Sequence, residues 1–124
     1  MSILRTEGII KDYPGTRELD DVTVSFDSGK VHAFIGKNGS GKSTLVKVFA
    51  GAIQPTSGHF YLDEEELHFS TPVEALNKGI ATVYQELSLV PHLSVAENIF
   101  MGNEICHKKG IVSLKMQKEK AQSI

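Results

Sequence analysis

The feature that most constrains this sequence is a glycine-rich loop between a predicted strand and a predicted helix. Gly36 and Gly41 are separated by four residues and followed directly by Lys42 and Ser43, the spacing G-x-x-x-x-G-K-[ST]. Glycines let backbone N–H groups turn inward around a polyphosphate without a side-chain clash, and the N-terminus of the following helix favours anions. The loop therefore predicts a phosphate-binding site.

Each residue type in this loop has a chemical reason. We expect Lys42 to reach the β- and γ-phosphates of a nucleotide, and the Ser43 hydroxyl to ligate Mg²⁺. The predicted nucleotide-binding set in this segment is Gly36, Asn38, Gly39, Ser40, Gly41, Lys42, Ser43 and Thr44.

Local patterns predict strands and helices in turn along the chain. Alternation at residues 22–26 and an apolar run at 31–35 predict a hairpin whose second strand lies in the core. The order of strand, phosphate loop, helix and strand indicates an α/β fold. The other expected elements are a helix at 42–50, strands at 59–62 and 67–69, a helix between Thr71 and Gly79, a strand at 80–84, a helix from Ser94 to about residue 101, and a last helix capped by Ser113.

Composition narrows the class of protein. The chain has 124 residues, of which 40% are hydrophobic, enough for a packed core in one domain or part of one. No apolar run is long enough to span a bilayer, and no secretory signal is recognisable near Met1. A net charge of −2 gives no reason to expect a nucleic-acid partner. The single cysteine, Cys106, fits a reducing compartment.

Two further positions and one segment add to the phosphate loop. Tyr13 lies in the sequence KDYPG, and Gln85 lies at the end of a predicted strand in VYQE. Together with the motifs LDDV (19–22), GSGKSTL (39–45), YQEL (84–87) and SVAENI (94–99), they resemble the ATP-binding cassette (ABC) family of transport ATPases. The resemblance covers about residues 3–103 and is strongest to the N-terminal part of the ATP-binding subunits of bacterial monosaccharide importers.

The resemblance implies a fold and a set of roles. It implies a P-loop NTPase of the cassette type, with an N-terminal antiparallel β subdomain and the start of the core sheet over residues 1–103. Residues 104–124 would begin a helical subdomain or form a basic tail. Tyr13 would stack on adenine, and Gln85 would ligate Mg²⁺ and help to place the attacking water. The segment after Gln85, with exposed Leu87, Leu89, Val90 and Leu93, would contact the membrane permease.

Several parts of a working cassette are not found in the sequence. We find no Leu-Ser-Gly-Gly-Gln-type signature, no convincing apolar strand ending in Asp-Glu, and no later switch histidine. We therefore interpret the chain as an N-terminal fragment of a cassette that has a second cassette as partner in the full-length protein. We expect it to bind ATP and Mg²⁺ on the cytoplasmic face of the membrane, without inserting into the bilayer and without hydrolysing ATP by itself.

Other interpretations stay open at this point. The strand-like run at 60–64 ends in Asp63 and Glu64, which imitates a magnesium-binding aspartate followed by a general base. A cassette ATPase acting in DNA repair or translation would share the same loop. A small P-loop kinase would need lid arginines, and the only two, Arg5 and Arg17, precede the loop. The five histidines are scattered without the spacing of metal ligands.

Overall fold

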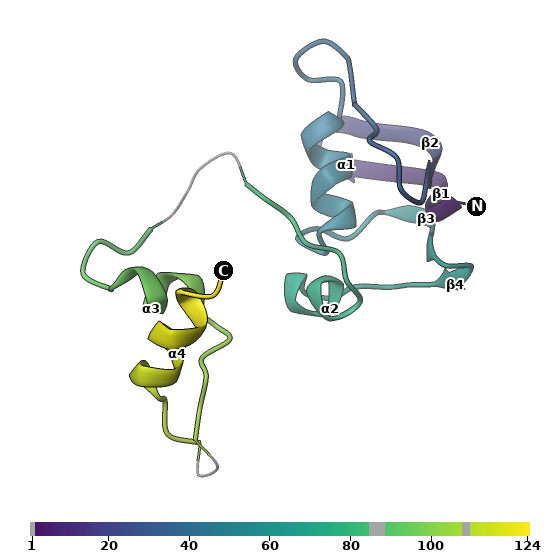
Figure 1. Cartoon of the computed structure of the whole chain (residues 1–124). Coiled ribbons are helices and arrows are strands. Elements are labelled where there is room, and N and C mark those ends of the chain that lie inside the picture. Colours follow the sequence, from purple (N-terminus) through teal and green to yellow (C-terminus); the bar gives the residue numbers. More distant parts are fainter. Residues whose placement is uncertain (1, 85–88, 108–109) are drawn as a thin grey trace. The chain divides into compact units, whose positions relative to one another are not determined.

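The structure is a computed structural model that describes residues 2–84, 89–107 and 110–124 (Figure 1). The chain divides into two compact units, Met1–Val83 and Tyr84–Ile124, and each is described by itself. Within the described residues, no helix is both long enough and apolar enough to cross a membrane.

A four-stranded antiparallel sheet forms the frame of the first unit. The strands are arranged in the order β2-β1-β3-β4, so β1 lies between the two strands that it pairs with (Figure 1). The predicted antiparallel β subdomain is therefore present. The strand bounds are β1 (Ser2–Tyr13), β2 (Thr16–Asp27), β3 (Ser57–Leu62) and β4 (Glu65–Glu66).

The pairing expected for residues 22–26 is wrong. These residues do form a strand, but β2 pairs with β1, with Val22 opposite Ile9 and Val24 opposite Thr6. Residues 31–35 and 80–84 form no strand, and the side chains of Val31 and Ile35 are 100% and 95% exposed. An apolar segment becomes a strand only when a neighbouring strand accepts its backbone hydrogen bonds, and no described strand pairs with either segment.

Helix α1 (Lys42–Phe49) packs against the sheet and confirms the helix predicted after the loop. It buries Leu45, Val48 and Phe49, and the chain turns away at Gly51, where φ is +67°. The ring of Phe49 lies 5.5 Å from that of Phe26 and 5.6 Å from that of Phe60, measured between centroids. These edge-on and tilted aromatic contacts join the helix to β2 and β3.

The chain after β3 differs in part from its prediction. The strand expected at residues 67–69 is wrong. The strand that follows β3 is β4, and residues 67–69 lie beyond it, with the side chains of Leu67 and Phe69 buried in the core. Helix α2 (Pro72–Asn77) starts as predicted, because the Thr71 hydroxyl accepts a hydrogen bond from the Glu74 N–H at 3.3 Å. The Glu74 carboxylate in turn accepts from the Ser70 N–H at 2.7 Å.

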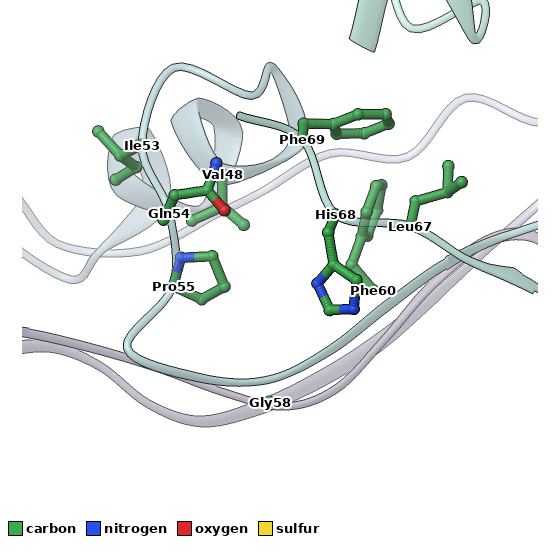
Figure 2. Close-up of a pocket in the computed structure, with 9 residues that line it drawn as sticks. All are labelled: Val48, Ile53, Gln54, Pro55, Gly58, Phe60, Leu67, His68 and Phe69. Carbon is green, nitrogen blue, oxygen red and sulfur yellow. The ribbon is translucent and has the colours of Figure 1, made fainter. Parts of the chain in front are cut away.

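A cavity of about 20 Å³ lies beside the C-terminal end of α1, lined by the nine residues drawn in Figure 2. That volume holds about one water molecule. Gly58 on its floor cannot carry a side chain, because a Cβ there would lie 2.4 Å from the Gly8 carbonyl oxygen. A nucleotide therefore has no room in this cavity.

The second unit contains two short helices in contact, α3 (Val95–Ile99) and α4 (Leu114–Ala121). The predicted capping box at α3 is complete, since Ser94 and Glu97 exchange side-chain-to-backbone hydrogen bonds. The Ser94 hydroxyl and N–H groups hold the pKa of Glu97 below its usual value. Ser113 caps α4 as predicted, by accepting from the Met116 N–H at 3.3 Å.

Candidate phosphate-binding site

The glycine loop lies on the surface and leads directly into α1. Residues 36–40 are exposed, and the Ser40 N–H donates to the Lys37 carbonyl at 3.2 Å to close a turn. Gly41 caps the helix with its carbonyl, which accepts from the Leu45 N–H at 2.8 Å. No side chain caps this helix, and its first turn holds no acidic residue. The N–H groups of that turn are therefore available to an anion.

Lys42 places its ammonium group across this loop. Its Nζ donates to the carbonyl oxygens of Gly36 at 2.8 Å and Lys37 at 2.7 Å, and to the Ser40 hydroxyl at 3.3 Å. The lysine thus reaches back over the loop from the first residue of the helix. A positive charge and the open helix N-terminus are brought together, which is the arrangement that a phosphate group requires.

Gly41 is the loop position at which a side chain is excluded by close backbone packing. Its φ is +83°, and a Cβ would lie 2.5 Å from the Glu18 carbonyl oxygen and 2.8 Å from the Leu19 side chain. Gly39 also has a positive φ, of +78°, but its surroundings are open. The start of β2 therefore fixes where the loop ends, and the loop requires glycine at Gly41 for both conformation and space.

The two hydroxyl residues after Lys42 lie in different surroundings. Ser43 is exposed, so its hydroxyl is accessible to a metal ion. Thr44 is buried, and its hydroxyl donates a hydrogen bond to the Glu18 carboxylate. This contact with Glu18 is not predictable from the sequence, because no local pattern links residues so far apart in the chain.

Tyr13 lies at the end of β1, next to the hairpin turn. Its side chain is 40% exposed, and the Lys11 ammonium lies 5.0 Å from the centre of its ring. Tyr13 of β1 pairs with Thr16 of β2. Thr16 lies two residues before Glu18, whose backbone carbonyl packs against Gly41. Two residues of strand span about 7 Å. The ring is therefore carried by the same end of the sheet as the phosphate loop.

Asp63 and Glu64 lie at the opposite end of the sheet. They form the β3–β4 turn, and the Asp63 N–H donates to the Ile3 carbonyl at 2.9 Å. The loop instead abuts Leu19, which pairs with Lys11 on β1. From residue 3 to residue 11 a strand spans on the order of 25 Å. The two acids therefore cannot act at the phosphate loop of the same chain.

The remaining site candidates are placed as follows. Gln85 and Leu87 lie outside the described residues. Among the residues that the structure describes, no three His, Cys, Asp or Glu side chains form a group able to hold a metal ion. His59 and His68 both lie within ion-pair distance of Glu66, at 2.6 and 3.4 Å, and the hydrogen bond from His59 lowers the pKa of Glu66.

Asn98 in α3 organises the segment that contains the predicted permease-contacting residues Leu89, Val90 and Leu93. Its Nδ2 donates to the carbonyl oxygens of Val90, Leu93 and Ser94 at 3.2, 3.1 and 3.0 Å. Its Oδ1 accepts from the Val90 N–H at 2.9 Å. The side chain of Leu89 is 70% exposed, and those of Val90 and Leu93 are 37% and 38% exposed. One amide thus fixes a turn that presents apolar side chains to solvent.

Comparison with known proteins identifies the family. The arabinose import ATP-binding protein AraG of Pectobacterium atrosepticum is 41% identical over 119 residues, which cover 96% of this chain and 23% of the relative. AraG of Escherichia coli O157:H7 is 46% identical over 110 residues, which cover 89% of this chain and 22% of the relative. This chain therefore spans about a quarter of the length of these curated relatives.

The fold agrees with that of a solved cassette. The structure of MJ1267, an ATP-binding cassette of an ABC transporter, superposes with a TM-score of 0.81 at 32% identity, over 100% of this chain and 53% of that one. The predicted P-loop cassette fold is confirmed by this likeness. The family model described as ABC transporter matches residues 19–124. The chain belongs to the ABC transporter family.

Proposed function

We propose that the loop at residues 36–44 binds the phosphates of ATP together with Mg²⁺. The observation that carries this proposal is the position of the Lys42 ammonium, held over a glycine loop that ends at the open N-terminus of α1. Charge and backbone donors converge there.

Each site residue has a proposed role. Backbone N–H groups of the loop would bind phosphate oxygens, and Lys42 would exchange its carbonyl contacts for the β- and γ-phosphates. Ser43 and Gln85 would hold Mg²⁺, which neutralises phosphate charge when bound. Tyr13 would stack on adenine. The loop residues that would line the phosphates are Gly36, Asn38, Gly39, Ser40, Gly41, Lys42, Ser43 and Thr44.

We further propose that the chain is part of the ATP-binding subunit of an importer for a monosaccharide. Support comes from the relatives named as arabinose import ATP-binding proteins, at 41% and 46% identity. These relatives are about four times as long as this chain. We therefore propose transport, its substrate and its partners for a longer protein that contains such a chain. That protein would act on the cytoplasmic face of the membrane, with a second cassette beside the first.

The permease would contact the turn held by Asn98. Leu89, Val90 and Leu93 are apolar and exposed on this turn, and exposed apolar groups of this kind mark interaction surfaces. Because Asn98 fixes the backbone with four hydrogen bonds, the surface is rigid before the partner arrives.

The phosphate-loop proposal is tested by titrating a fluorescent ATP analogue, with Mg²⁺, into the wild type and Lys42→Ala. We expect the variant to bind about tenfold more weakly or worse, because a charge-assisted contact contributes roughly 1.5–3 kcal/mol.

Lys47→Ala is the matched control, since it removes an equal charge from the last turn of the same helix. It should bind as the wild type does. Equal affinities for the wild type and Lys42→Ala, or equal losses in both variants, would contradict the proposal.

A further inference from the structure

Glu18 of β2 contacts the phosphate loop in two ways. Its carbonyl oxygen would lie 2.5 Å from a Cβ added at Gly41. Its carboxylate accepts a hydrogen bond from the hydroxyl of Thr44, which is only 9% exposed. One residue of the sheet therefore braces both the last glycine of the loop and the first turn of α1.

The Glu18 carboxylate also adds negative charge near the N-terminus of α1, which favours anions. The N-terminus of α1 is open and has no acid of its own in the first turn, so Glu18 supplies a negative charge there through Thr44. A phosphate bound to the same turn would be repelled by this charge. It would also find the Thr44 hydroxyl already engaged as a donor.

The cations of the preceding residue and of the loop, Arg17 and Lys42, are bound to other partners. Arg17 precedes Glu18 in the strand, but its guanidinium is bound to Asp12 at 2.7 Å and Asp20 at 2.8 Å. These two carboxylates hold the pKa of Arg17 above its usual value. The Lys42 ammonium is bound to the loop carbonyls. Among these groups, the partner of the Glu18 carboxylate is the Thr44 hydroxyl.

We propose that Glu18 is a positioning residue that holds the phosphate loop in shape and at the same time lowers its affinity for nucleotide. Phosphate and Glu18 compete for the Thr44 hydroxyl and for the positive end of α1. The inference rests on the proposed function of the loop and adds a residue that sets how tightly nucleotide is held.

The experiment measures the affinity of a fluorescent ATP analogue with Mg²⁺ for the wild type, Glu18→Gln and Glu18→Ala. Glu18→Gln keeps an oxygen acceptor for Thr44 but removes the charge, and we expect it to bind on the order of tenfold more tightly. Glu65→Gln is the control, because it removes an equal charge from β4, at the opposite edge of the sheet from β2. It should change the affinity less than twofold.

Ionic strength separates electrostatic opposition from a purely structural role. The gain of Glu18→Gln over the wild type should shrink at high salt, since screening weakens the repulsion. Thermal unfolding of each variant shows whether it is folded; if Glu18→Ala does not fold, Glu18→Gln alone decides. An unchanged or weaker affinity for Glu18→Gln, or a gain that is independent of salt, would overturn the inference. Absence of Lys42-dependent binding in the wild type would instead refute the proposed function of the loop.

Discussion

At the scale of single residues, Tyr13 combines exposure with a fixed position. It ends β1, and its pairing with Thr16 keeps it at the end of the sheet that abuts the loop. Lys11 lies over its ring at 5.0 Å, and the Lys11 ammonium also donates to the Gln54 carbonyl at 2.7 Å. The ring is therefore held from one side by a tethered cation, while 40% of the residue stays accessible to a base.

We expect Tyr13→Ala to weaken binding of the ATP analogue about fivefold or more, because stacking of a base on an aromatic ring contributes on the order of 1–3 kcal/mol. Tyr13→Phe should bind nearly as the wild type does, since stacking uses the ring and not the hydroxyl. The measurement is the same fluorescence titration. If the phenylalanine variant binds as poorly as the alanine variant, Tyr13 does not act by stacking.

At the scale of elements, the β3–β4 hairpin carries local strain. Its turn consists of Asp63 and Glu64, both with positive φ, of +47° and +66°. A two-residue turn of this kind favours Asn or Asp followed by Gly, because a side chain at the second position costs about 1 kcal/mol. Glu64 forms an exposed ion pair with Arg5 at 3.4 Å, and such pairs contribute little to stability.

Glu64→Gly should therefore stabilise the first unit, by roughly 0.5–1 kcal/mol or a few degrees in Tm. Glu65→Gly is the control: it places the glycine inside β4, where φ is not positive, and removes the ion pair of Glu65 with Lys78 at 2.9 Å. That variant should lower the Tm. Thermal unfolding followed by circular dichroism measures both, and a lower Tm for Glu64→Gly would show that the turn is not strained.

The same elements show what the sequence can and cannot predict. The helix starts at Thr71, Ser94 and Ser113 were predictable, because a cap depends on residues three positions apart. The pairing of β2 was not, because alternation in a strand gives its buried face but not its neighbour. Residues 31–35 show the same limit, since their apolar run predicts a strand that no described partner completes.

In the candidate site, too, the local motif could be predicted from the sequence, but the contacts between distant residues could not. The phosphate loop is a local motif, so its place directly before α1 follows from the spacing of its residues, although the strand expected just before it, at residues 31–35, is not formed. The contact of Glu18 with Thr44 joins distant parts of the chain and required the structure. The structure also decided against Asp63 and Glu64 as site residues, because strand register places them far from the loop.

At the scale of the whole molecule, ATP binding and ATP hydrolysis depend on different groups. In the proposed function, the loop, Lys42 and Ser43 would supply the ground-state contacts with the phosphates. Phosphoryl transfer also needs a base or a water-orienting carboxylate, and a donor that closes over the γ-phosphate from the other side. The resemblance to ABC ATPases implies that this donor comes from the signature segment of a partner cassette, a motif that we do not find among the 124 residues.

We therefore expect the isolated chain to bind ATP without hydrolysing it at a measurable rate. Losing such groups raises the barrier by on the order of 4–7 kcal/mol, or several powers of ten in rate. The measurement is phosphate release by the purified chain, with Lys42→Ala as the control for contaminating ATPases. Lys42-dependent release faster than about 1 per second would contradict the prediction. Because Asp63 and Glu64 lie at the far end of the sheet from the loop, their own chain could not use them as metal ligand and base. Another carboxylate would then have to act, and if a second copy of the chain provided it, the rate per chain would rise with protein concentration.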